Sequence, residues 1–202
     1  MDIPATDACY RLIHRMGMLD HIAAHSIRVC QVASLISENL LDKGVAVNLS
    51  LITAASLLHD ITKTRSFETR ENHAETGEQY LRDLGYPEVG DIVGQHVRLL
   101  VYADDGLPTE AEIVNYADKR VLHDQIVSLE ERMAYILERY GGGADHLFER
   151  LQWLCDRTAA LEKKLFSYMD FSPETLQAQI SPESFADSLN AYQEAKRARH
   201  LA

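Results

Sequence analysis

Apolar and polar residues recur along most of the chain with the spacing of amphipathic helices. Val29, Val32 and Ile36 form one such stripe, because residues three and four positions apart share a helix face. No segment alternates apolar and polar residues for long enough to predict a strand. The pattern therefore predicts an all-α fold. The predicted helices cover 6–16, 20–39, 51–61, 73–84, a segment from Pro87, a segment after Thr109, 128–140, 144–169 and a segment from Pro182.

The segment 51–63, LITAASLLHDITK, is the most apolar stretch of the chain. An apolar run without a polar face predicts a central, buried helix. This helix ends in His59 and Asp60, and burying an unpaired carboxylate costs several kcal/mol unless it is paired or metal-bound. The polar residues that follow, KTRSFETRE at 63–71, predict a loop.

Other predicted helices carry metal-ligand types on their inward stripes. One histidine on an apolar face is usually a core residue with its own hydrogen bond. Four histidines and two aspartates on five helices are satisfied together if they share one metal centre. These residues are His25, His59, Asp60, His73, His96 and Asp118. His21, one turn from His25, is a further candidate, whereas the pair His123–Asp124 lies near a helix end and is interpreted as unrelated.

The predicted ligand set contains imidazoles and carboxylates but no thiolate. It suits divalent iron, manganese, cobalt, nickel or zinc. Six ligands exceed one tetrahedral site and match two metals, for which Asp60 is the natural bridge. Two metals about 3.5–4 Å apart acidify a water and clamp a phosphoryl group. The three cysteines are odd in number and form no zinc or disulfide pattern, which favours a reducing cytoplasm.

Three motifs resemble those of the HD superfamily of metal-dependent phosphohydrolases. They are H-S-I-R-V at 25–29, L-L-H-D-I-T-K at 57–63 and N-Y-A-D at 115–118. H-A-E-T-G at 73–77 and G-Q-H at 94–96 are similar to segments that supply two further histidines in the dinuclear, YqeK-type branch, which hydrolyses diadenosine tetraphosphate. Thr62 stands where the signature usually has glycine, and Lys119-Arg120-Val121 departs from the continuation in that branch. The resemblance covers about residues 15–125.

The resemblance implies an HD-type helical bundle and a role for each motif residue. His25, His59, Asp60 and Asp118 would hold one metal, and Asp60, His73 and His96 the second. A hydroxide bridging the metals would be the nucleophile, and Lys63 would contact the substrate phosphate beside the catalytic Asp60. Nearby cations are further candidates for substrate binding, because guanidinium and ammonium groups bind phosphate. These are Arg65, Arg70, Arg98 and Lys119.

Charge and hydropathy restrict the partners. A net charge of -11 argues against a large nucleic acid, while a metal can still attract a small phosphorylated ligand. We find no run of about 18 apolar residues that predicts a membrane span, and no secretory signal pattern at the start. The expected substrate is a small phosphate ester, such as a nucleotide monoester, cyclic nucleotide or dinucleoside polyphosphate. A non-catalytic HD-like regulatory module and a dinuclear-iron oxygenase are the alternatives.

The chain of 202 residues is predicted to comprise an HD core at 1–125 and a helical extension at 126–202. Three glycines at 141–143 mark either the boundary of an appendage or the turn of an αα-hairpin. The apolar helices after Ser128 could cover the core, form a lid or mediate a homo-oligomer, and the sequence leaves these three roles open.

Overall fold

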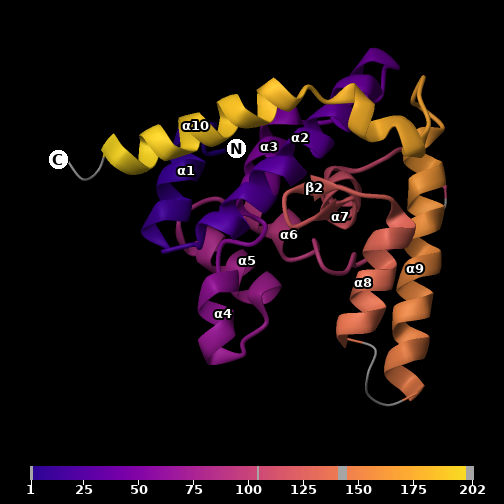
Figure 1. Cartoon of the computed structure of the whole chain (residues 1–202), viewed down its shortest axis with the longest axis horizontal. Coiled ribbons are helices and arrows are strands. Elements are labelled where there is room, and N and C mark those ends of the chain that lie inside the picture. Colours follow the sequence, from indigo (N-terminus) through magenta and orange to yellow (C-terminus); the bar gives the residue numbers. More distant parts are fainter. Residues whose placement is uncertain (1, 104, 141–144, 199–202) are drawn as a thin grey trace.

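The computed structural model describes residues 2–103, 105–140 and 145–198 (Figure 1). The regular secondary structure of this part of the chain is almost all helix, so the all-α prediction is confirmed. In chain order the elements are α1 (Thr6–Arg15), α2 (Asp20–Asp42), α3 (Leu49–Leu58), α4 (Lys63–Thr69), α5 (His73–Asp83), α6 (Pro87–Val93), α7 (Glu110–Lys119), β1 (Val121–Leu122), β2 (Gln125–Ile126), α8 (Leu129–Tyr140), α9 (Asp145–Phe166), the 3-10 helix η1 (Pro173–Gln179) and α10 (Pro182–Ala198).

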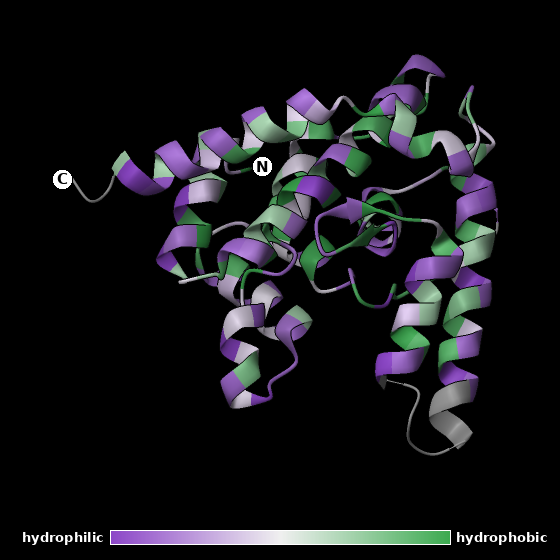
Figure 2. Ribbon diagram, in the orientation of Figure 1, coloured by the Kyte–Doolittle hydropathy of each residue, from purple (hydrophilic) through white to green (hydrophobic). Residues whose placement is uncertain are grey.

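The core is built around α2 and α3. The two helices pack against each other, α7 packs on both, and α1 and α6 complete the surroundings of α3. Most side chains of α3 are buried, as its uninterrupted apolar sequence predicts. In Figure 2 the apolar residues concentrate on these central helices, whereas α9 and α10 alternate apolar and polar positions. The centre of the bundle therefore positions the residues that follow α3.

The segment after α3 differs from the prediction. The helix ends at Leu58, before the predicted end at 61, and residues 59–62 form a turn. The predicted loop at 63–71 contains the short helix α4. None of the residues of α4 is buried, so it has no apolar stripe by which the sequence pattern could reveal it. The turn separates two helices and places His59 and Asp60 between them.

A short antiparallel ribbon also departs from the strand-free prediction. Val121 pairs with Ile126 and Leu122 with Gln125. His123, in the connecting turn, has a φ of 56°, a left-handed conformation that is uncommon outside glycine. Strands of two residues are too short to show a period of two in the sequence, which explains why they were not predicted.

The C-terminal helices lie against the core. Helix α9 contacts both α8 and α7, and α10 crosses α1 and α2 (Figure 1). The buried ring of Tyr192 on α10 packs edge-on against Tyr10, and its hydroxyl lies 3.2 Å from Asp20 Oδ1. The glycines at 141–143 lie outside the described residues. The boundary at residue 125 stays a prediction, and the extension is packed on the helices before it.

Among the described residues, no helix combines the length and the apolar composition needed to cross a bilayer.

Candidate metal centre

His59 and Asp60 lie at the centre of the bundle, in the turn after α3, and both are completely buried. The Nδ1 atom of His59 lies 2.8 Å from the carbonyl oxygen of Ser56, to which it donates a hydrogen bond. In a neutral ring this bond leaves Nε2 without a hydrogen, so Nε2 presents a lone pair. His59 Nε2 and Asp60 Oδ1 are buried and have no hydrogen-bond partner. Two such atoms side by side need a ligand, because unsatisfied buried polar groups are costly.

One group of ligand atoms forms between α2, α7 and this turn. His25 Nε2, from α2, lies 3.0 Å from Asp118 Oδ1, from α7. His59 Nε2 lies 3.7 Å from the same oxygen and 3.3 Å from Asp60 Oδ2. His25 Nδ1 donates to the carbonyl oxygen of His123 over 2.7 Å, which orients the ring. The ligand atoms of His25, His59 and Asp118 are close enough to share one ion.

A second group forms on the other side of Asp60. Asp60 Oδ1 lies 3.3 Å from Nε2 of His73, the first residue of α5. The same oxygen lies 3.5 Å from Nε2 of His96, which follows α6. The two histidine nitrogens are 3.1 Å apart, and His96 Nδ1 donates to the carbonyl oxygen of Val93 over 2.7 Å. The two oxygens of Asp60 therefore face different sets of histidines.

The donor atoms fit metal ions. In His25, His59 and His96 the Nδ1 hydrogen is directed at a backbone carbonyl, so each Nε2 presents a lone pair. These lone pairs face carboxylate oxygens with no hydrogen between them, an arrangement that a cation stabilises. Neutral imidazole and carboxylate are the ligands of divalent transition metals. The cluster could therefore hold such ions. The side chains of His73 and Asp118 are partly exposed at its edges.

Both aspartates are held in the ionised form. Burial opposes ionisation of Asp60, but the neighbouring His59 and the charge of Lys63 outweigh it and hold the pKa of Asp60 well below its ordinary value. For Asp118, burial is likewise outweighed by the neighbouring His25 and the charge of Arg132, and its pKa is also well below its ordinary value. Burial opposes the charge of Lys63, but Asp60 and Asp118 raise its pKa. The two ionised carboxylates therefore favour the binding of cations in the site.

Thr62 ties the two halves of the site together. Its buried hydroxyl donates to the carbonyl oxygen of His73 over 2.8 Å and lies 2.9 Å from Thr76 Oγ1. Its φ of -104° requires no glycine. The threonine at the usual glycine position of the signature therefore fits this backbone and helps to fix the start of α5.

Lys119 lies beneath the site. Its amino group donates to the carbonyl oxygens of His96 and Asn115, at 3.1 and 3.2 Å, and to Asn115 Oδ1 at 3.0 Å. Burial lowers the pKa of Lys119 to about 8, against the opposing charge of Asp118. The Asn115 side chain in turn donates to the carbonyl oxygens of Gln95 and His96. In this geometry Lys119 and Asn115 hold the backbone of His96.

The other cations predicted to bind substrate have different surroundings. Lys63 Nζ lies in the cluster, 2.7 Å from Asp60 Oδ2. Arg65 pairs with Glu71 at 2.5 Å, and Arg70 is exposed at the end of α4 in a left-handed conformation. The guanidinium carbon of the exposed Arg98 lies 5.8 Å from the ring centroid of Trp153. The structure thus brings Lys63 to the ligands, while Arg65 and Arg98 are engaged with other side chains.

Two features of the site were not predicted from the sequence. The pair His123–Asp124 contributes backbone carbonyls, which accept from His25 and from Arg28 respectively. Arg132 on α8 approaches Asp118, with Nη2 3.8 Å from Oδ1. Neither could be found from ligand spacing, because a carbonyl has no sequence signature and Arg132 lies beyond the motifs. His21, the further candidate, is exposed on α2 and separate from the buried stripe.

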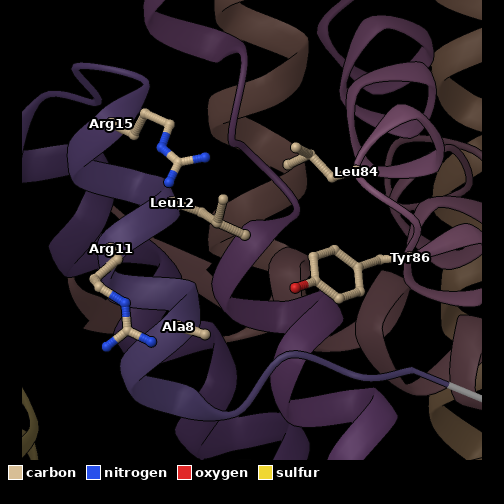
Figure 3. Close-up of a pocket in the computed structure, with 6 residues that line it drawn as sticks. All are labelled: Ala8, Arg11, Leu12, Arg15, Leu84 and Tyr86. Carbon is tan, nitrogen blue, oxygen red and sulfur yellow. The ribbon is translucent and has the colours of Figure 1, made fainter.

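A separate hollow of about 190 Å³ lies beside α1 (Figure 3). Arg11 and Arg15 line it from α1, and Tyr86, beyond α5, faces them with its hydroxyl. Among the described residues, no imidazole or carboxylate lines this hollow, and Arg11 pairs with Asp7. It therefore lacks the donor set of the cluster around Asp60.

Two known proteins are similar to this chain in sequence. The chain is 28% identical over 142 residues to a tRNA (cytidine(56)-2'-O)-methyltransferase of Thermoplasma volcanium, a match covering 64% of this chain and 40% of that protein. The chain thus spans less than half of that relative. It is 24% identical over 135 residues to an uncharacterized protein of Methanocaldococcus jannaschii, covering 60% of this chain and 79% of the relative.

The comparison with solved structures found no match. The comparison with protein families did: the family model described as HD domain matches residues 22–121. This segment begins on α2, ends on β1 and contains all six clustered histidines and aspartates. The motifs, the helical fold and the buried cluster agree with this match of residues 22–121 to the HD domain family.

Proposed function

We propose that the protein is a metal-dependent phosphohydrolase with two metal ions, acting on a small phosphate ester, in particular a nucleotide. The observation that carries the proposal is the position of Asp60. Its Oδ2 faces His59, and its Oδ1 faces His73 and His96, each within 3.5 Å. A carboxylate that faces two sets of imidazoles is suited to bridge two ions, as in the dinuclear branch of the HD superfamily.

Each half of the site has its own ligands in this proposal. His25, His59 and Asp118 serve one ion, His73 and His96 serve the other, and Asp60 serves both. When bound, such a pair supplies a Lewis acid and an acidified water for hydrolysis. The carbonyl oxygens of Ser56, Val93 and His123 keep three of the histidine rings in the tautomer that binds metal.

Lys63 is the residue of the chain best placed to meet the substrate. Its side chain is 32% exposed, whereas Asp60 beneath it is 1% exposed. A flexible ammonium group at this position can exchange the carboxylate for a phosphate oxygen and stabilise the charge that develops on it. Because the net charge is -11, binding of a phosphate ester depends on such local positive charge.

The test begins with elemental analysis of the protein after loading with iron, manganese, cobalt, nickel or zinc. Each form is then assayed for release of phosphate or nucleotide from monoesters, cyclic nucleotides and dinucleoside polyphosphates. We expect about two metal equivalents and metal-dependent turnover. Asp60→Asn should lower kcat/KM by more than about a thousandfold, since several kcal/mol of charge stabilisation are lost. Asp83→Asn, at an exposed carboxylate on α5, is the matched control.

The same experiment separates the alternatives. A protein that binds no metal under any loading condition would be a non-catalytic module. An iron-loaded protein that consumes oxygen and releases no phosphate from any ester would be an oxygenase. Full turnover by the Asp60→Asn variant would exclude the proposed site.

A further inference from the structure

Helix α8 brings an arginine to the edge of the cluster, from outside the matched HD segment. Arg132 Nη2 lies 3.8 Å from Asp118 Oδ1, which is too far for a hydrogen bond. Its side chain is 14% exposed, similar to the 13% of Asp118. The extension after residue 121 therefore places a cation beside a predicted metal ligand.

Arg132 has hydrogen-bonding capacity that the protein does not use. Its Nε is buried and has no hydrogen-bond partner. Buried guanidinium groups normally satisfy their donors, and a fork of planar N–H groups matches the oxygens of a phosphate. An arginine held close to a carboxylate without a bidentate bond to it leaves donors for another anion.

Helix α8 packs against α7 and α9. The buried Met133 lies next to Arg132 in the sequence. Tyr135 stacks edge-on against the ring of His123, with centroids 6.0 Å apart, and also lies 5.8 Å from the Arg132 guanidinium. Since the carbonyl of His123 orients His25, this contact joins α8 directly to the support of the cluster. The packing of α8 therefore determines where Arg132 lies.

Arg132 and Lys63 reach the cluster from different helices. Lys63 on α4 lies against Asp60, and Arg132 on α8 lies near Asp118. Burial lowers the pKa of Lys63, whereas Asp60 and Asp118 raise it, and the charge of Arg132 lowers it slightly. A phosphate group at the cluster would therefore meet Lys63 near Asp60 and Arg132 near Asp118.

We infer that Arg132 is a substrate-binding residue, whose guanidinium binds an oxygen of the substrate phosphate beside Asp118. The inference rests on the proposed function for the identity of the ligand. It also gives the C-terminal extension a role: α8 completes the phosphate site of the HD domain. No covalent step is added.

The test measures the binding of inorganic phosphate to the manganese-loaded chain of 202 residues by titration calorimetry. Arg132→Ala should raise the Kd by about 10- to 100-fold, the effect of losing charged hydrogen bonds. Arg132→Lys should bind at an intermediate level, because it keeps the charge but loses the planar fork. Arg150→Ala, an exposed arginine on α9, should leave the Kd unchanged. Metal content and the melting temperature are measured for each variant.

Each outcome decides the inference. Equal phosphate affinity of the wild type and Arg132→Ala overturns it, as does a wild type that binds no phosphate. A loss of metal in Arg132→Ala also overturns it, because Arg132 would then act by holding Asp118. If Arg132→Ala does not fold, the Arg132→Lys variant decides alone by its Kd. Phosphate binding that depends on Arg132 without hydrolysis of any ester would refute the proposed function and leave the anion site standing.

Discussion

Lys63 Nζ lies 2.7 Å from Asp60 Oδ2, so the first residue of α4 is bonded to the carboxylate in the turn that ends α3. This contact satisfies one oxygen of a completely buried aspartate. It also keeps a partly exposed ammonium group above the cluster.

Replacement of Lys63 should affect catalysis more than metal binding. We expect Lys63→Met to lower kcat/KM by about a hundredfold, a loss typical of removing one charge-stabilising donor. The metal content should stay unchanged, because the lysine donates to Asp60 and is not itself a ligand. Steady-state kinetics and elemental analysis of the same preparation measure both effects. Loss of metal together with activity would assign Lys63 a structural role instead.

The two halves of the cluster should lose metal separately. His73→Asn removes a ligand that lies near Asp60 Oδ1, so about one metal equivalent should be lost. His25→Asn should remove metal from the half near Asp118. Elemental analysis gives the stoichiometry, and His21→Asn, on the same helix but exposed, is the control. Simultaneous loss of all metal from both variants would indicate a single shared ion.

Asn115 should contribute to stability and to the position of His96. Its amide donates to two carbonyl oxygens at 2.9 Å and its oxygen accepts from Lys119. Asn115→Ala leaves these buried groups unsatisfied, so we expect about 2–3 kcal/mol of destabilisation in urea unfolding. Metal affinity should fall as well. Asn39→Ala, at a half-buried asparagine on α2, should change stability by less than about 0.5 kcal/mol.

The stability of the metal-free protein should depend on the ionisation of Asp60 and Asp118. Both pKa values are lowered in the folded state, so these groups release their protons more readily when folded. Their contribution is present above the unfolded value of about 3.9 and is lost as the pH falls through the folded values. Urea unfolding at pH 7 and pH 3 should show that wild type loses more stability than Asp118→Asn. An equal loss in both proteins would contradict the linkage.

The contact of α10 with α1 should be important for folding. Tyr192 is 1% exposed and packs against Tyr10 and Asp20. Tyr192→Ala should lower the free energy of unfolding by about 3 kcal/mol, as is typical of emptying a buried aromatic site. The exposed Glu194 on the same helix supplies the control, Glu194→Ala. A variant as stable as wild type would show that α10 is an independent appendage.

The sequence by itself determined the helical fold class and identified the candidate metal ligands. The apolar run that ends in His59 and Asp60 predicts that both side chains are buried. Buried polar side chains need partners, and this need follows from the local sequence alone. The same holds for the spacing that puts His25 on the inward face of α2, since a helix fixes the side of each residue. Short elements without an apolar stripe, such as α4 and the ribbon after Val121, could not be read in this way.

Only the tertiary structure decided which atoms meet. The 3.0 Å approach of His25 to Asp118 joins residues that are 93 positions apart, and the carbonyl of His123 supports His25 from 98 positions away. Such contacts depend on how α2, α7 and the ribbon pack, and a carbonyl is the same in every residue. Arg132 entered the site for the same reason: the packing of α8, rather than any motif, brings it to Asp118.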